Sequence, residues 1–207
     1  MNFEENIKSY VKFDSNIPKK KGLLSFIWLI LIICIPTGIF GAYASITKNI
    51  ILPLLTIIVL WAIYLLINTE QKNQFILFLG VSSIFISISL LIATYKIVTI
   101  ETEILLSHIL IIMIIYVLLN ITNTLNTLRL IKNGYFNVRK KSKNHLSIIF
   151  GAGLFGLVVG RILFTDLTQD TAVVVIAIIF IFLAFLFSTG THNLLKYFFI
   201  KKYKIEL

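Results

Sequence analysis

The chain has 207 residues, of which 58% are hydrophobic and 14% are charged, and its mean hydropathy is +0.95. Soluble domains average about 45–50% apolar and about 25% charged residues, so this composition excludes a soluble globular protein. Six membrane helices of about 20 residues each would occupy most of the chain and leave no room for a separate folded domain. We therefore expect an all-α polytopic membrane protein that forms one helix bundle.

The first segment, residues 1–22, is polar and basic. Phe3, Ile7, Tyr10 and Val11 recur within it at helical spacing, which places them along one side of a short helix. An apolar stripe opposite a basic face is typical of a helix that lies flat in the headgroup region of a membrane. We expect an N-terminal amphipathic interfacial segment here.

Six apolar runs follow, and each is long enough to cross a hydrocarbon core of about 30 Å at a helical rise of about 1.5 Å per residue. They cover approximately residues 23–45, 50–68, 74–95, 103–122, 146–165 and 171–190. The pattern predicts a six-transmembrane-helix bundle over residues 23–190, with residues 191–207 as a basic cytoplasmic tail.

The basic residues indicate how the chain is threaded through the membrane. With the N-terminus inside, 16 of the 19 lysines and arginines fall in cytoplasmic segments. Only Lys48 and Lys96 fall in outer loops, and Arg161 lies within the fifth run. Because basic residues concentrate on the cytoplasmic side, we expect both termini to be cytoplasmic. Abundant Ile, Lys and Asn with few Ala indicate an AT-rich genome, and we expect a bacterial cell membrane.

The start of the chain also has an alternative interpretation. A basic region, an apolar stretch and the triplet Ala42, Tyr43 and Ala44 imitate a secretory signal with its cleavage site. The first apolar run is about 23 residues long, whereas signal peptides have a core of about 7–15. An uncleaved first helix is therefore the preferred interpretation.

The longest connection, residues 123–145, begins as a continuation of the fourth helix, and Asn133 with Gly134 has the chemistry of a helix stop. A basic patch follows, which we expect to face the anionic inner leaflet of the bilayer. The patch consists of Arg139, Lys140, Lys141 and Lys143. No recognisable nucleic-acid-binding module surrounds it, so we expect no nucleic-acid partner.

Ionisable residues near the outer ends of the helices suggest a polar cluster, because such groups are costly at membrane depth unless they meet a partner or a cavity. Arg161 and His108 fall at similar predicted depth, with four carboxylates around them. The candidate outer polar cluster is His108, Arg161, Glu101, Glu103, Asp166 and Asp170. The alternatives are that Arg161 extends to the outer headgroups and that His108 hydrogen-bonds to an adjacent helix.

A second polar set lies at the predicted cytoplasmic ends of the helices. This candidate inner polar cluster consists of Asn68, Asn120, Asn123, Thr189, Thr191, His192 and Asn193. The preferred interpretation is hydrogen bonding between helices. Were the same residues to line an inward-facing vestibule, they would suit a neutral polar solute or a backbone segment of a partner.

The fifth run contains the clearest helix-packing signal. Ala152, Gly156 and Gly160 recur every four residues, and Gly153 adds to the same side. Stripes of small residues let helix backbones approach closely in membranes. We expect this face to pack within the bundle, with a homo-oligomer or a partner helix as the alternative.

The sequence lacks the residue patterns of membrane enzymes. Apart from Glu103 at the first position of the fourth run, none of the predicted spans contains an Asp or Glu, and no phosphate-binding loop follows a strand. Cys34 is the single cysteine, so neither an intramolecular disulfide nor a thiolate metal cluster can form. We expect no catalytic residues, no metal and no cofactor.

Three functional classes remain. The preferred one is a non-enzymatic protein that recognises a membrane protein or a membrane-active peptide, as in self-protection or immunity, defence, or an export-accessory subunit. The second is a small-solute transporter or the substrate-binding membrane subunit of one. The third is an oligomeric channel. The first is preferred because small-residue packing is the strongest intramembrane feature of the sequence.

Overall fold

The computed structural model describes residues 3–13, 20–68, 70–101, 106–138 and 169–206, and within these ranges all regular structure is helical. The helices are α1 (Phe3–Lys12), α2 (Lys20–Ile39), α3 (Ala44–Ile67), α4 (Lys72–Glu101), α5 (Leu106–Lys132), α6 (Tyr135–Val138), α8 (Gln169–Ser188) and α9 (Thr191–Tyr203). The expected all-α class is confirmed.

Five helical stretches in the described part of the chain are long and apolar enough to cross a membrane. They are Gly22–Ile39, Ala44–Ile67, Lys72–Thr99, Leu110–Lys132 and Thr171–Tyr203. These stretches correspond to five of the six predicted apolar runs. The other run, 146–165, lies outside the described residues.

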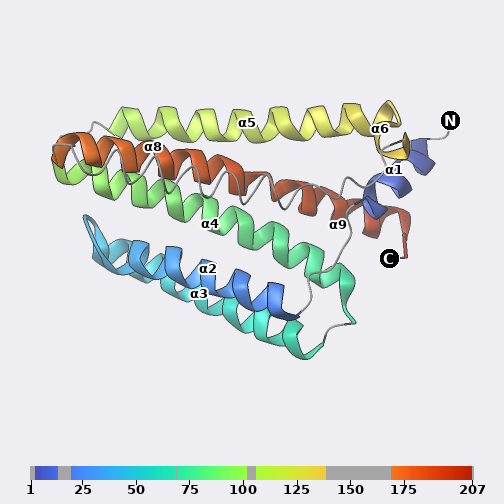
Figure 1. Cartoon of the computed structure of the whole chain (residues 1–207), viewed down its shortest axis with the longest axis horizontal. Coiled ribbons are helices and arrows are strands. Elements are labelled where there is room, and N and C mark those ends of the chain that lie inside the picture. The colour runs from blue at the N-terminus through green and yellow to red at the C-terminus, as the bar shows by residue number, and fades with distance from the viewer. Residues whose placement is uncertain (1–2, 14–19, 69, 102–105, 139–168, 207) are drawn as a thin grey trace.

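Helix α4 lies at the centre of the arrangement (Figure 1). The α2–α3 hairpin packs on one side of it, and α8 with α9 packs on the other. Helices α1 and α6 lie near α9 at the end where both chain termini are found, which we call the terminal end. The turn between α2 and α3 lies at the other end, which we call the opposite end.

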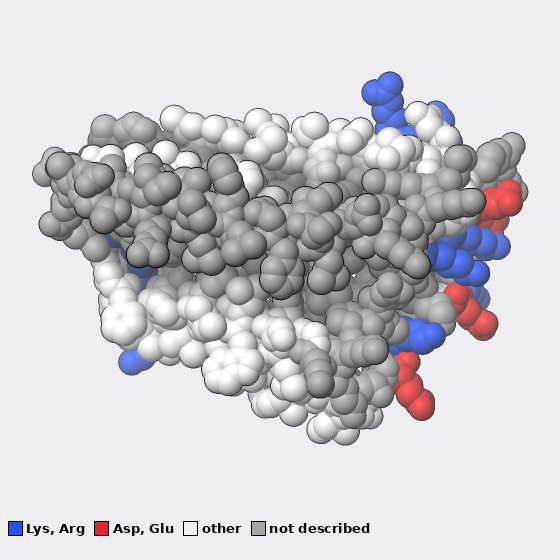
Figure 2. Space-filling model, in the orientation of Figure 1, with Lys and Arg blue, Asp and Glu red and all other residues white. Residues whose placement is uncertain are grey.

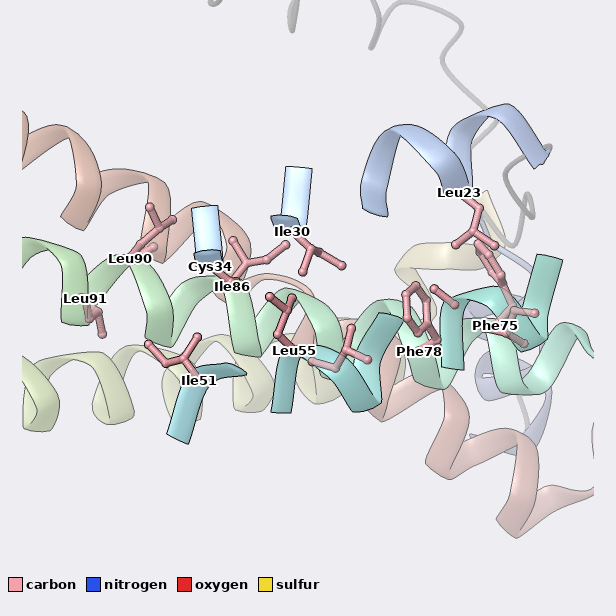
Figure 3. Close-up of a cluster of buried hydrophobic side chains, with 14 of the residues drawn as sticks. Leu23, Ile30, Cys34, Ile51, Leu55, Phe75, Phe78, Ile86, Leu90 and Leu91 are labelled. Atoms are coloured by element: carbon pink, nitrogen blue, oxygen red, sulfur yellow. The ribbon is translucent and has the colours of Figure 1, made fainter. Parts of the chain in front are cut away.

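A cluster of buried apolar side chains joins α4 to its neighbours (Figure 3). Phe78 and Ile86 of α4 are fully buried, and Cys34 of α2 and Ile51 of α3 lie in the same cluster. Within a bilayer, such side chains stabilise the bundle through close packing, because lipid tails are as apolar as the side chains themselves. The α2–α3–α4 unit is therefore held by shape complementarity.

Small and hydroxyl-bearing residues bring α8 and α9 close to α4. A side chain at Gly190 would collide with Ser83, and a Cβ at Gly80 would lie 2.6 Å from Leu194 Cδ2. Further along α4, the Ser87 hydroxyl donates a 2.6 Å hydrogen bond to the carbonyl of Ala184. The glycines permit the close approach, and the serine then links the two backbones.

The first connection lies earlier than predicted. The first apolar run was expected to continue to residue 45, but α2 ends at Ile39 and α3 begins at Ala44. The turn contains Gly41 at φ 84° and Tyr43 at φ 56°, which are left-handed conformations. Hydropathy did not reveal this turn because its residues are themselves mostly apolar.

The predicted placement of Lys96 in an outer loop is wrong. Lys96 lies inside α4 near the opposite end and is only 3% exposed. Its ammonium donates hydrogen bonds to Thr37 O at 2.6 Å, Phe40 O at 2.8 Å and Thr47 Oγ1 at 2.6 Å. The lysine thereby supplies donors to carbonyls at the end of α2, which have no partners within their own helix. Lys48, the other predicted loop residue, lies in α3.

Helix α1 forms as predicted, but its apolar stripe faces protein instead of lipid. Ile7, Tyr10 and Val11 are at most 2% exposed, whereas Phe3 is half-exposed. The three buried residues belong to a second apolar cluster with Ile76, Ile131, Phe199, Ile200 and Ile205. The N-terminal segment is therefore docked on α5, α6 and α9.

The predicted basic tail is in fact a helix that packs against the rest of the bundle. Helix α9 covers most of residues 191–207, and it buries Lys196, Phe199 and Ile200. Its remaining lysines contribute to the charged side chains that gather at the terminal end (Figure 2). Apolar side chains at helical spacing between the lysines hold α9 against α1 and α4.

Candidate functional site

A cavity of about 650 Å³ lies at the terminal end, where α1, α5, α6 and the junction of α8 with α9 meet. Ser83 of α4 contributes to its wall. The other lining residues are Tyr10, Phe13, Asn123, Asn126, Thr127, Leu130, Tyr135, Phe136, Leu186, Phe187, Thr189, Gly190, His192, Asn193 and Lys196. Amides and hydroxyls mix here with aromatic rings, a histidine and a lysine. We call this site the junction cavity.

The junction between α8 and α9 is a break in a long apolar helix. Thr189 and Gly190 separate the two helices within the stretch Thr171–Tyr203. The N–H groups of Thr189 and Gly190 each donate a hydrogen bond to the carbonyl three residues earlier. These carbonyls are Leu186 O, at 3.2 Å, and Phe187 O, at 2.9 Å. The Thr189 hydroxyl also donates to Leu186 O, at 2.7 Å. Such side-chain bonds compete with regular helix and bend it.

Three asparagines on the cavity wall have unpaired side-chain amides. Within the described part of the chain, the carboxamides of Asn123, Asn126 and Asn193 make no hydrogen bond. Each carboxamide has two donors and one acceptor oxygen. Asn126 is exposed and Asn123 and Asn193 are half-buried, so their donors and acceptors are accessible to a molecule that enters the cavity.

His192 connects three helices at the cavity. Its Nδ1 lies 3.1 Å from Thr127 Oγ1 of α5, and its backbone carbonyl accepts a 3.2 Å hydrogen bond from the Tyr10 hydroxyl of α1. Burial raises the pKa of the Tyr10 hydroxyl well above its ordinary value, so the phenol stays protonated and can donate at physiological pH. The imidazole is therefore held at a fixed position between α9 and α5.

Lys196 lies one helical turn after His192 and is only 8% exposed. Its ammonium donates a 2.6 Å hydrogen bond to Phe13 O and lies 5.6 Å from the centre of the Tyr10 ring. The lysine thus ties the end of α1 to α9. Among the described residues that line the cavity, none is an aspartate or a glutamate.

Hydrogen bonds also hold α1 against the turn between α5 and α6. The Asn6 amide donates to Lys132 O at 3.3 Å, and the Asn137 amide donates to Asn6 Oδ1 at 2.6 Å. Gly134, at φ 69°, forms the turn between α5 and α6 as the sequence predicted. The ring of Phe136 then meets that of Tyr10 edge-on at 4.9 Å. The aromatic wall of the cavity therefore depends on the docking of α1.

Part of the predicted inner polar cluster lies at this cavity. Four of its members line the wall, namely Asn123, Thr189, His192 and Asn193. Asn120 and Thr191 instead line a neighbouring, mostly apolar pocket of about 370 Å³. Asn68 caps α3 and donates to Tyr64 O within its own helix at 3.3 Å, so it belongs to neither pocket.

The other predicted sites remain predictions. Arg161, Glu103 and Asp166 of the outer polar cluster lie outside the described residues. The backbones of Glu101, His108 and Asp170 lie at the opposite end, where α4 ends and α5 and α8 begin. Also outside the described residues are the helix-packing face, Ala152, Gly153, Gly156 and Gly160, and the basic patch, Arg139, Lys140, Lys141 and Lys143.

Several cavity residues had a local signal that sequence reasoning did not use. Thr127 follows Asn123 by four residues and Lys196 follows His192 by four, which places each pair on one helix face. Tyr10 and Phe13 had no such signal, because they reach the cavity only through the docking of α1. In the described ranges, no three His, Cys, Asp or Glu side chains come close enough to hold a metal ion.

Comparisons of the chain with protein-family models, with curated proteins and with solved structures found no match.

Proposed function

We propose that the chain is a cell-membrane protein with six transmembrane helices and both termini in the cytoplasm. The five described stretches alone would leave the termini on opposite sides of a membrane. Helix α1 nevertheless contacts α9, so both termini belong to one end. A sixth crossing within residues 139–168 would bring both termini to the same side of the membrane, and the predicted run 146–165 falls there.

The charges support the same orientation. Most described lysines and arginines belong to the terminal end, whereas Lys48 and Lys96 belong to the opposite end. Because basic residues favour the cytoplasmic face, the terminal end is the cytoplasmic one. The junction cavity then lies on the inner side of the membrane. A bacterial source remains our proposal from composition alone.

We further propose that the protein binds a small neutral polar solute in the junction cavity and acts as a transporter or as the substrate-binding subunit of one. The observation that supports this most is that three carboxamides, none with a hydrogen-bond partner among the described residues, line one cavity beside a break within a long apolar helix. Solute sites of transporters are typically built around broken helices that line a cavity.

The lining favours an uncharged solute. No described lining residue is acidic, and the ammonium of Lys196 is engaged by Phe13 O. Amides and hydroxyls offer donors and acceptors without charge, while the aromatic wall offers apolar surface. A cavity of about 650 Å³ also falls within the usual range of small-molecule sites, about 300–1,000 Å³.

The preferred sequence-based hypothesis, recognition of a membrane protein or peptide, depended on the face from Ala152 to Gly160 and on the outer loops. A peptide backbone would also satisfy the carboxamides of the cavity. Recognition therefore becomes one of the outcomes that the binding experiment distinguishes.

The test is thermal unfolding of the purified protein in lipid nanodiscs with a panel of solutes at millimolar concentration. The panel contains nucleosides, sugars, N-acetyl amino-acid amides, and charged amino acids for comparison. A solute present at about 100 times its Kd stabilises the folded state by about 2.7 kcal/mol, which is readily measured. We expect at least one neutral class to raise the Tm and the charged solutes to leave it unchanged.

Two leucine variants form the matched control pair. Asn193→Leu removes a cavity amide, whereas Asn68→Leu removes an exposed amide of α3 outside the cavity. The stabilisation should vanish in the first variant and persist in the second. Absence of stabilisation by every solute, together with a peptide that co-purifies in stoichiometric amount, would overturn the solute proposal in favour of recognition.

A further inference from the structure

We infer that the solute is a neutral heteroaromatic molecule that donates a ring N–H to His192 Nε2 in the junction cavity. This inference rests on the proposed function and names the class of solute. It depends on which nitrogen of His192 carries the proton, on the amides that line the same cavity, and on the aromatic side chains of that cavity.

The hydrogen bonds of Thr127 determine which nitrogen of His192 carries the proton. Thr127 is 3% exposed, and its hydroxyl donates to Asn123 O, one turn earlier in α5, at 2.9 Å. A hydroxyl has one proton, so its contact with His192 Nδ1 at 3.1 Å requires that Nδ1 be the donor. This tautomer is assigned from the hydrogen-bonding pattern.

The other ring nitrogen is then an acceptor. An imidazole is mostly neutral at pH 7, and a neutral ring protonated at Nδ1 has a bare lone pair at Nε2. Among the described residues, none donates to His192 Nε2. A solute that fills this position must offer a donor, because a second acceptor would leave two lone pairs facing each other.

The amides refine the class of solute. A carboxamide nitrogen can donate to a carbonyl oxygen next to that ring N–H, so the amides favour a heterocycle edge on which an N–H is flanked by carbonyl oxygens. Asn123 and Asn193 present such groups from α5 and α9. Nucleobases have edges of this kind, whereas sugars present separate hydroxyls.

The aromatic wall favours a flat ring. Phe13 and Phe136 are half-buried, their ring centres lie 5.3 Å apart, and together they form an apolar surface on the cavity; the buried Tyr10 ring packs against Phe136 at 4.9 Å. Any flat aromatic ring can stack on such a surface, whichever polar atoms it carries at its edge. In nucleic-acid-binding proteins, stacking on an aromatic side chain is worth about 1–3 kcal/mol per base. A neutral nucleoside combines this flat face with the required edge.

The experiment compares four probes in the nanodisc thermal-unfolding assay: uridine, 3-methyluridine, ribose and uridine 5′-monophosphate. Methylation at N3 removes the ring donor without adding charge. We expect uridine to stabilise the wild-type protein, 3-methyluridine to bind at least about tenfold more weakly, and ribose and the monophosphate to have no effect. These comparisons use the unaltered protein and do not depend on the folding of any variant.

Two substitutions of His192 then test its role. A glutamine side chain can place an acceptor oxygen near the position of Nε2, whereas an asparagine side chain reaches only as far as Nδ1. His192→Gln should retain the preference for uridine over 3-methyluridine, and His192→Asn should lose it. Thr127→Val should also weaken the preference, because the imidazole is then free to adopt either tautomer.

The outcomes separate this inference from the function on which it rests. Equal stabilisation by uridine and 3-methyluridine would overturn the assignment of His192 as acceptor. Stabilisation by sugars or amino-acid amides but not by uridine would overturn the heteroaromatic class and leave solute binding intact. Failure of every solute would overturn both.

Discussion

Replacing Lys96 with methionine tests how the α2–α3 turn is held to α4. Methionine preserves most of the length and volume of the side chain but removes its three N–H donors. In the wild-type protein those donors satisfy Thr37 O, Phe40 O and Thr47 Oγ1 at distances of 2.6–2.8 Å. Two backbone carbonyls at the end of α2 therefore lose a charge-assisted hydrogen bond in the variant.

The cost of this change can be worked out from the number of acceptors left behind. Thr47 Oγ1 also bonds to backbone carbonyls of the same turn, so its hydroxyl stays paired. Each of the two carbonyls loses a partner at a cost of about 1–3 kcal/mol. The ammonium itself no longer has to be buried, which offsets part of this loss. We expect Lys96→Met to lower the free energy of unfolding by about 2–4 kcal/mol.

The measurement is unfolding in mixed detergent micelles, followed by circular dichroism as the denaturing detergent is increased. Lys48→Met is the matched control, because Lys48 lies exposed on α3 near the same turn. The control should unfold within about 0.5 kcal/mol of the wild type, as surface substitutions usually do. Equal stability of the two variants would refute the conclusion that Lys96 anchors the turn.

Two further predictions concern close packing and the docking of α1. Gly190→Ala should destabilise the protein by about 1–3 kcal/mol, because the added methyl group collides with Ser83. Gly38→Ala should be tolerated, since a Cβ there would lie 3.5 Å from its nearest neighbour, an ordinary contact distance. Thermal unfolding of the two alanine variants in nanodiscs measures the difference in their stability. Ile7→Ala should weaken the docking of α1 by about 2–5 kcal/mol and expose it to protease, whereas Phe3→Ala at a half-exposed position should not. Equal rates of N-terminal cleavage in the last two variants would contradict the docking of α1.

Local chemistry made the helices and some of their ends predictable. The end of α5 at Lys132 followed from Asn133 and Gly134, because a glycine at positive φ is a local signal. The amphipathic α1 was likewise recognisable from spacing alone. These features depend on residues close to each other in the chain.

Features that depend on distant residues could not be predicted in this way. The partners of Lys96 lie 49–59 residues earlier in the chain, so a hydropathy profile treats the lysine as the end of a span. The surface beneath α1 comes from α5 and α9, which are more than 100 residues away. No pattern within residues 1–22 distinguishes that surface from lipid.

The candidate site was predictable only in part, to the extent that it depends on residues close to each other in the chain. Polar side chains near the ends of predicted spans marked Asn123, His192 and Asn193 in advance. The placement of Asn120 and Thr191 in a separate pocket was not predictable, because it depends on the break at Thr189 and Gly190 and on how α5 packs beside α9.

The most direct test of the central claim, that the junction cavity binds a neutral polar solute, is affinity selection with mass spectrometry. The wild-type protein and Asn193→Leu, both in nanodiscs, are incubated with one mixture of nucleosides, sugars and amino-acid amides, and the retained solutes are identified. We expect at least one neutral solute to be retained by the wild type and lost from the variant. Retention of nothing by the wild type, or equal retention by both proteins, would contradict the claim.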